Sequence, residues 1–120
     1  MASWDYFVGF ERIPEGLDAF LDKQGYDKIK TGRDCSDINY ESRKGGLVEL
    51  YYFPKSPEVT EVGVPDWRRA GFIVISELMI STKDSGAVEE ASRLADEIAK
   101  RYKGILYDSC SNDFFRSDEL

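Results

Sequence analysis

Three short apolar runs stand out along the chain, and each has the two-residue period of a β-strand. They are 4–10 (WDYFVGF), 47–53 (LVELYYF) and 70–82 (AGFIVISELMIST). The first two alternate between a strongly apolar face and a more mixed one, which is typical of strands with one buried face. The third is apolar on both faces, so we expect it to be a central strand. A fourth, shorter strand is predicted at 105–107.

Two segments have the three- and four-residue spacing of amphipathic helices. The shorter one is predicted at roughly 14–24, where Gly25 would end it. The stronger one is predicted at 85–104, where Ser85 would cap the first turn and Gly104 would terminate the helix.

The polar segment between the first helix and strand 47–53 is the least regular part of the pattern. Weak alternation predicts one exposed edge strand somewhere within 27–42, whose Lys and Asp side chains would discourage pairing with other chains. Gly45 and Gly46 then form a turn. The stretch 54–69 holds three of the 4 prolines, so we expect a long loop there, and such loops are often functional.

This order of elements predicts a single α+β domain, residues 1–120, with two helices packed on one face of a mainly antiparallel sheet. The ferredoxin-like (split βαβ) arrangement is the first choice. In that topology the strand after the first helix and the last strand lie at opposite edges. Cys35 and Cys110 would then be too far apart for a disulfide, whose Cα atoms lie within ~7 Å, so both are predicted to be free thiols.

The net charge restricts the classes of molecule that we expect this protein to bind. The 120 residues carry 23 acidic and 16 basic side chains, for a net charge of −7. Such a field repels phosphate backbones and anionic lipid headgroups, so we expect neither nucleic acid nor a membrane as partner. No apolar run is long enough to span a bilayer and no secretory signal is present, which makes the cytoplasm the expected compartment.

The chain contains no histidine, and this excludes more chemistry than any other feature. No Ser-His-Asp or Cys-His pair can form, and no histidine-ligated zinc site. The two cysteines are far apart and form no CxxC motif, so a thiolate zinc site is not expected either. We therefore predict no catalytic residue, no cofactor and no metal. An enzyme would need buried acids with raised pKa values in a cleft, and it ranks last among the hypotheses.

Two polar clusters contain carboxylates that could in principle bind a metal ion. In 108–119, Asp108 and Glu119 have the spacing of a calcium-binding loop, but Asp113 stands where such a loop needs glycine. A turn in which Asp and Ser side chains bond their own backbone explains that cluster better. The second cluster comprises Asp34, Asp37 and Glu41. Paired carboxylates can hold Mg²⁺, but nothing in the pattern marks one of them as buried.

Aromatic and arginine side chains are the best candidates for a partner-binding surface, because these types most often anchor interfaces. The candidates are Trp67, Arg68, Arg69, Tyr51, Tyr52 and Tyr40. If Trp67 folds inward it closes the loop over the sheet, and only an exposed Trp67 makes the loop a docking site. Tyr51 and Tyr52 point to opposite faces of one strand. The face without helices could therefore present tyrosines together with a strand residue such as Glu77.

One segment carries a family resemblance. Residues 94–108, LADEIAKRYKGILYD, combine Leu-Ala and Ile-Ala pairs on the helix with a glycine link and an apolar strand that ends in Asp108. This pattern resembles the last helix and strand of small bacterial immunity proteins of the polymorphic-toxin type and of related families. The resemblance implies an inhibitor, and the acidic charge fits inhibitors that dock on basic nucleases. It carries over no functional residue.

Two hypotheses of different class follow. The leading one is a non-enzymatic, acidic protein-binding domain, most concretely an immunity or inhibitor protein that binds a basic partner through its surface. A contiguous acidic and aromatic patch would favour it. The alternative is a small-molecule-binding domain with the ligand between the sheet and loop 54–69. A deep pocket lined by Tyr and Trp would favour that one. Homodimerisation through a sheet edge or the open face is compatible with either.

Overall fold

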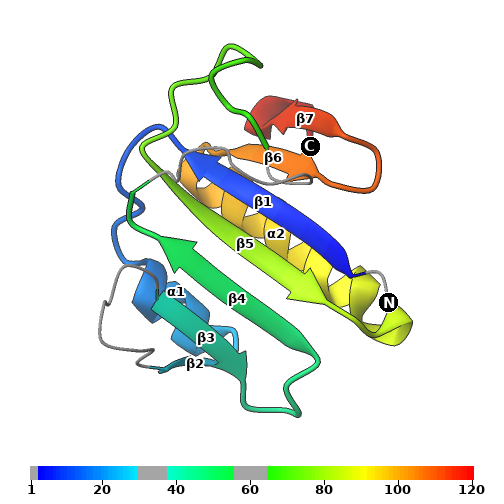
Figure 1. The fold of residues 1–120 in the computed structure, drawn as a ribbon. Helices are drawn as coiled ribbons and strands as arrows, with labels where there is room; N and C mark the ends of the chain where they lie inside the picture. The colour runs from blue at the N-terminus through cyan, green and yellow to red at the C-terminus, as the bar shows by residue number, and fades with distance from the viewer. Residues whose placement is uncertain (1–2, 30–37, 56–64) are drawn as a thin grey trace.

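A seven-stranded antiparallel sheet forms the body of the protein in the computed structural model, which describes residues 3–29, 38–55 and 65–120 (Figure 1). The strands are β1 (Trp4–Phe10), β2 (Tyr26–Ile29), β3 (Ile38–Ser42), β4 (Val48–Phe53), β5 (Ser76–Thr82), β6 (Ile105–Asp108) and β7 (Asp113–Arg116). Their order across the sheet is β2-β3-β4-β5-β1-β6-β7, and every neighbouring pair is antiparallel.

Two α-helices, α1 (Leu17–Lys23) and α2 (Val88–Tyr102), lie together on one face of this sheet (Figure 1). Short 3₁₀ turns precede α2 at Ser85–Ala87 and follow β7 at Ser117–Glu119. The main core lies between α2 and the central strands, and its fully buried members include Ala91, Leu94, Ala95, Ile98, Val8, Leu50, Leu78 and Ile80. The predicted α+β class, with both helices on one face of an antiparallel sheet, is confirmed. No helix among the described residues is both long and apolar enough to cross a membrane.

The ferredoxin-like prediction is wrong for the sheet as a whole. The second crossover does split around a strand, because β5 and β6 flank β1 and α2 connects them. The first crossover does not, because α1 leads to β2 at the far edge, with β3, β4 and β5 between β2 and β1. A hairpin at one edge and β7 at the other widen the sheet beyond the four strands of the ferredoxin-like arrangement.

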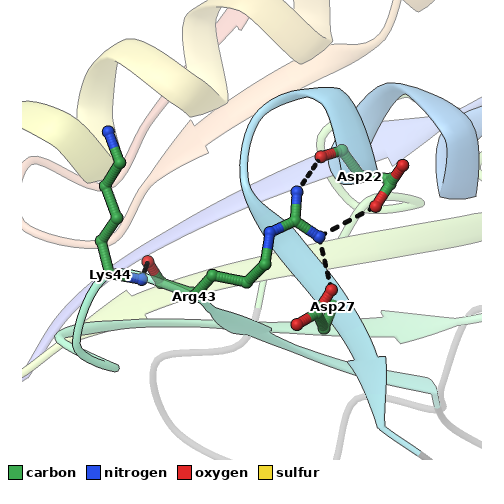
Figure 2. A network of polar contacts seen from close by, with 5 residues as sticks. Asp22, Asp27, Arg43 and Lys44 are labelled. Atoms are coloured by element: carbon green, nitrogen blue, oxygen red, sulfur yellow. Dashed lines mark hydrogen bonds and ion pairs between the residues drawn. The ribbon is translucent and has the colours of Figure 1, made fainter.

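The edge strand expected within 27–42 is in fact two paired strands, β2 and β3. The buried Tyr40 of β3 donates a hydrogen bond from its hydroxyl to Asp18 on α1. Arg43, just after β3, bonds the carboxylates of Asp22 and Asp27 at 2.9 and 2.5 Å (Figure 2). These contacts tie the edge hairpin to α1. Side chains of a polar-looking segment can therefore support two strands where the alternation predicted one.

Several element ends differ from the prediction. Strand β5 begins at Ser76 and not at 70, because residues 66–71 form a turn closed by their own backbone hydrogen bonds. Asp84, and not Ser85, caps the 3₁₀ turn that leads into α2, since its carboxylate accepts a hydrogen bond from Gly86 N at 2.7 Å. Ala87, the residue before α2 itself, makes no side-chain capping bond. At the end of α2 the left-handed residue is Lys103, with φ of 51°.

Gly104 is required by packing and does not act as the helix cap. A Cβ at this position would lie 2.8 Å from Cγ1 of Val8 and 2.9 Å from the carbonyl oxygen of Gly9. Real side chains do not approach so closely, so only glycine lets the chain pass from α2 into β6 directly against β1.

The polar cluster after β6 is a hairpin turn, as the turn hypothesis predicted. The Asp108 carboxylate accepts a hydrogen bond from Cys110 N at 2.9 Å, and Asn112 adopts φ of 59°. The strand that follows, β7, was not predicted. Cys110 is an exposed free thiol, whereas Cys35 lies outside the described residues, so its state stays a prediction.

Candidate functional site

The sheet face opposite the helices, hereafter the open face, presents a row of polar side chains across five strands. Strand register places Asp5 (β1), Ser81 (β5), Glu49 (β4), Glu41 (β3) and Asp27 (β2) directly beside one another in that order. We call these five residues the acidic row. Each comes from the mixed face of its strand, since the alternate positions are buried under the helices. The row therefore runs at right angles to the strands across most of the sheet.

The outer acids of this row are bonded to Ser81 and Arg43, whereas neither acid of the middle pair has a cation beside it among the described residues. Ser81 Oγ donates a hydrogen bond to Asp5 at 2.6 Å, and Arg43 forms an ion pair with Asp27 at 2.5 Å. Glu41 and Glu49 are exposed and directly opposite each other, and no ion pair within residues 3–29, 38–55 and 65–120 involves either one. Like charges placed directly across strands are destabilising. A cation between them would relieve this repulsion.

Next to the acidic row lies a row of largely apolar side chains. Register aligns Ile29, Asn39, Tyr51, Met79 and Phe7 on the open face from β2 to β1. Tyr51 is half-buried and joins the two rows, because its hydroxyl donates a hydrogen bond to Oε2 of Glu49 at 2.5 Å. Half-buried Phe53 lies two residues along the same strand face. Acidic and aromatic side chains thus share one continuous surface.

A shallow hollow of about 440 Å³ adjoins the acidic row where β4 begins and β5 ends. Its lining includes Glu49, Ser81, Lys83 and Asp84. Two of these are carboxylates and one is a lysine, so the hollow has mixed charge. A side chain of a partner that binds the acidic row could therefore also contact the hollow.

The other half of the open face is covered by residues 65–75, hereafter the cover. In Figure 1 this segment runs beside β6 and β7 before it enters β5. Trp67 of the cover is 4% exposed and packs with Phe7, Ile105 and Tyr107, and half-buried Phe72, Val74, Met79 and Phe114 surround them. We call these eight residues the aromatic cluster. The Trp67 ring lies edge-on to Phe114, with centroids 5.6 Å apart.

Gly9 is what allows Trp67 to lie flat against β1. A Cβ on Gly9 would come within 3.0 Å of the Trp67 ring and 2.8 Å of Cγ2 of Val74. A side chain here would push the cover away from the sheet. The glycine in the first strand run therefore has a packing role that the alternation alone did not indicate.

Beside this contact lies the buried acid Glu77, on β5 opposite Gly9 and Phe53. Its side chain is 1% exposed, and burial raises its pKa from 4.5 to about 7. The Trp67 indole N–H faces the carboxyl group closely enough to offset part of that increase. Neither the indole nitrogen nor Glu77 Oε2 has a hydrogen-bond partner of normal geometry among the described residues.

The six predicted partner-binding residues do not form one surface. Trp67 folds inward, which is the first of the two predicted outcomes, and Arg68 and Arg69 are exposed on the turn of the cover. Tyr40 and Tyr52 lie on the helix side of the sheet, where Tyr40 is buried and Tyr52 is half-buried. Only Tyr51 lies on the open face beside the acidic row.

The other residues considered as site candidates from the sequence also lie in different parts of the molecule. Glu41 belongs to the acidic row, whereas Asp34 and Asp37 lie outside the described residues. Glu77 is on the expected face but under the cover, so it lines no exposed groove. No group of three or more metal-ligating side chains was found in the part of the chain that the structure describes. Glu49 and Asp5 were overlooked as site residues, although the alternation of their strands already placed them on the mixed face.

No protein-family model, curated protein or solved structure matches this chain. Its function must therefore be argued from the geometry of the open face.

Proposed function

We propose that this protein is a non-enzymatic protein-binding domain that docks a basic partner on the acidic row of its open face. The observation that supports the proposal is the Glu41–Glu49 pair, which forms no ion pair within the described residues and lies beside the half-buried Tyr51. These residues form a contiguous acidic and aromatic patch, which is the feature expected to favour a protein-binding domain. Carboxylates attract Lys and Arg, and a half-buried aromatic ring provides an apolar anchor next to them.

The mechanism would be electrostatic and steric. The net charge of −7 speeds encounter with a basic protein, and a cationic side chain placed between Glu41 and Glu49 replaces repulsion by attraction. A face-to-face homodimer would instead bring two acidic rows together, so the charge disfavours that mode of association. An immunity or inhibitor role in the cytoplasm remains the most concrete form of the proposal. The segment with the family resemblance, 94–108, forms most of α2 and all of β6, and β6 pairs with β1 next to Asp5 at one end of the acidic row.

The small-molecule alternative receives less support from the packing. Trp67, Phe72 and Val74 fill the space between the sheet and the cover. Residues 56–64 of the predicted loop lie outside the described part of the chain. The hollow beside Glu49 is polar and lies at a different place from the predicted ligand site.

A comparative capture experiment tests the proposal. Wild-type protein, a Glu41→Gln/Glu49→Gln variant and a Glu15→Gln/Glu89→Gln control would each be immobilised and exposed to a lysate of the native host. Both variants lose two negative charges, but Glu15 and Glu89 are exposed residues near the N-terminal ends of the two helices. We expect a basic protein to be retained by wild type and control and lost by the open-face variant.

The open-face variant should remain folded, because it removes a like-charge pair worth roughly 0.2–1 kcal/mol of repulsion. Urea denaturation of the three proteins checks this directly. Equal retention of the same basic protein by all three would contradict the proposal, as would capture of acidic proteins alone.

A further inference from the structure

Glu77 is an acid without a charged partner in an apolar enclosure. It lies on the central strand β5, where Met79 is the next residue on the open face. Across the ladder it faces Gly9 on β1 and Phe53 on β4. An ionised carboxylate in such a place loses its hydration, which costs several kcal/mol unless another group compensates.

The charged side chains of the elements around this site have other partners or are exposed, and none of those described shifts the pKa of Glu77. Asp66 is half-buried and accepts a hydrogen bond from Arg69 N at 3.1 Å, while the Arg68 and Arg69 side chains are exposed. On β1 the acid is Asp5, which is bonded to Ser81, and just after β1 Glu11 forms an ion pair with Arg116 at 3.8 Å. The forces that shift the pKa of Glu77 are burial and the Trp67 N–H, with no charged side chain among the described residues.

The cover is attached to the sheet mainly by side chains. Within the described residues, the backbone hydrogen bonds of 65–74 are local, from Ala70 N to Asp66 O, from Gly71 N to Arg68 O and from Phe72 N to Trp67 O. The bond from Ile75 N to Phe10 O, 2.9 Å long, joins the end of the cover to β1. Lifting residues 65–74 would therefore break aromatic packing but no strand pairing of the sheet. Segments held in this way open with smaller free energies than core strands.

We infer that Glu77 and the cover form a proton-operated device, in which loss of the Glu77 proton loosens Trp67 and uncovers the aromatic cluster. The protonated carboxyl group is neutral and tolerates burial. Once ionised, Glu77 regains water only when the cover lifts from the sheet. The Phe7, Tyr107 and Phe114 rings then become accessible next to the acidic row. The device is a property of the free protein and does not depend on the proposed partner.

The pH dependence of cover opening follows from the pKa of Glu77 in the closed form and its pKa in the open form. With the cover closed, the pKa of Glu77 is about 7, and with the cover open it approaches the ordinary value of 4.5. The opening constant then rises about tenfold per pH unit between these values and levels off above pH 7. The full change is up to about 300-fold.

Hydrogen exchange of the Trp67 indole N–H, followed by NMR from pH 5 to pH 8, tests the device. This proton is shielded from water only while the cover is closed, and a Trp4→Phe variant assigns the indole signal. After division by the intrinsic exchange rates, we expect the opening constant to rise about tenfold per pH unit up to neutrality. It should exceed the opening constant of the Leu78 amide in β5, which reports global unfolding.

Two variants and one further measurement make the test decisive. Glu77→Gln should remove the pH dependence, whereas Glu49→Gln, on the exposed part of the same face, should keep it. A ¹³C titration of the Glu77 carboxyl group in the wild-type protein provides the check if Glu77→Gln does not fold. The inference is overturned if that group titrates near pH 4.5. It is also overturned if the opening constant is independent of pH, or if Trp67 exchanges only together with Leu78.

Discussion

Two residues, Glu77 and Gly9, explain why half of the open face is covered and contains a buried acid. They are directly paired across β5 and β1, and each has an environment that its own strand pattern did not reveal. Gly9 makes room for the Trp67 ring, and the ring then buries Glu77. A lone acid within the apolar run 70–82 indicated a position of interest. Its burial depended on a loop residue ten positions earlier, whose inward fold alternation cannot predict.

The burial of Glu77 predicts how the free energy of unfolding depends on pH. The pKa of Glu77 is raised from 4.5 to about 7, so the folded protein keeps a proton that the unfolded chain releases. The stability contribution of this proton is complete below about pH 4.5 and is lost as the pH rises through about 7. Glu77→Gln should therefore be more stable than wild type at pH 8, by up to about 3 kcal/mol, with a much smaller difference at pH 4.5.

Urea denaturation of both proteins at the two pH values measures this difference. Glu49→Gln is the control, because it removes an acid that is exposed on the same face of the sheet. A gain from Glu77→Gln that is the same at pH 4.5 and pH 8 would contradict the assigned burial of the ionisable group.

At the scale of elements, the strands and helices with strong periodicity were predictable and the weakly patterned ones were not. Strand β1 has the predicted bounds, and α2 and β6 lie where the pattern placed them. The β2–β3 hairpin was merged into one strand, because its support comes from α1 through Tyr40 and Arg43 and not from alternation. Strand β7 is only four residues long and pairs with β6 through a polar turn, so its sequence carried little signal.

The start of α2 gives a prediction at this scale. Asp84→Ala should destabilise the protein by about 1 kcal/mol, because the Asp84 carboxylate caps Gly86 N. Ser85→Ala should have an effect close to zero, since no capping hydrogen bond from Ser85 is present in the described residues. Thermal or urea denaturation of both variants decides between the observed cap and the one expected from the sequence. A larger loss for Ser85→Ala would contradict the structure at this turn.

At the scale of the whole molecule, composition indicated the character of the candidate site but not its place. The excess of acids and the abundance of tyrosine were apparent from the sequence. The acidic row depends on the register of five strands, which is set by the packing of their buried faces and by the turns between them. The alternation separates Tyr51 from Tyr52 but does not tell which of them lies on the open face, and Tyr40, predicted as a surface residue, is buried and bonded to Asp18 of α1.

Amide chemical-shift mapping of the ¹⁵N-labelled protein with its captured basic partner tests the central claim most directly. We expect the largest perturbations at the open-face positions of β2, β3 and β4, centred on Glu41, Glu49 and Tyr51, and we expect them to weaken as salt is added. Perturbations centred on α1 and α2, or binding that salt leaves unchanged, would contradict the claim that the acidic row is the docking surface.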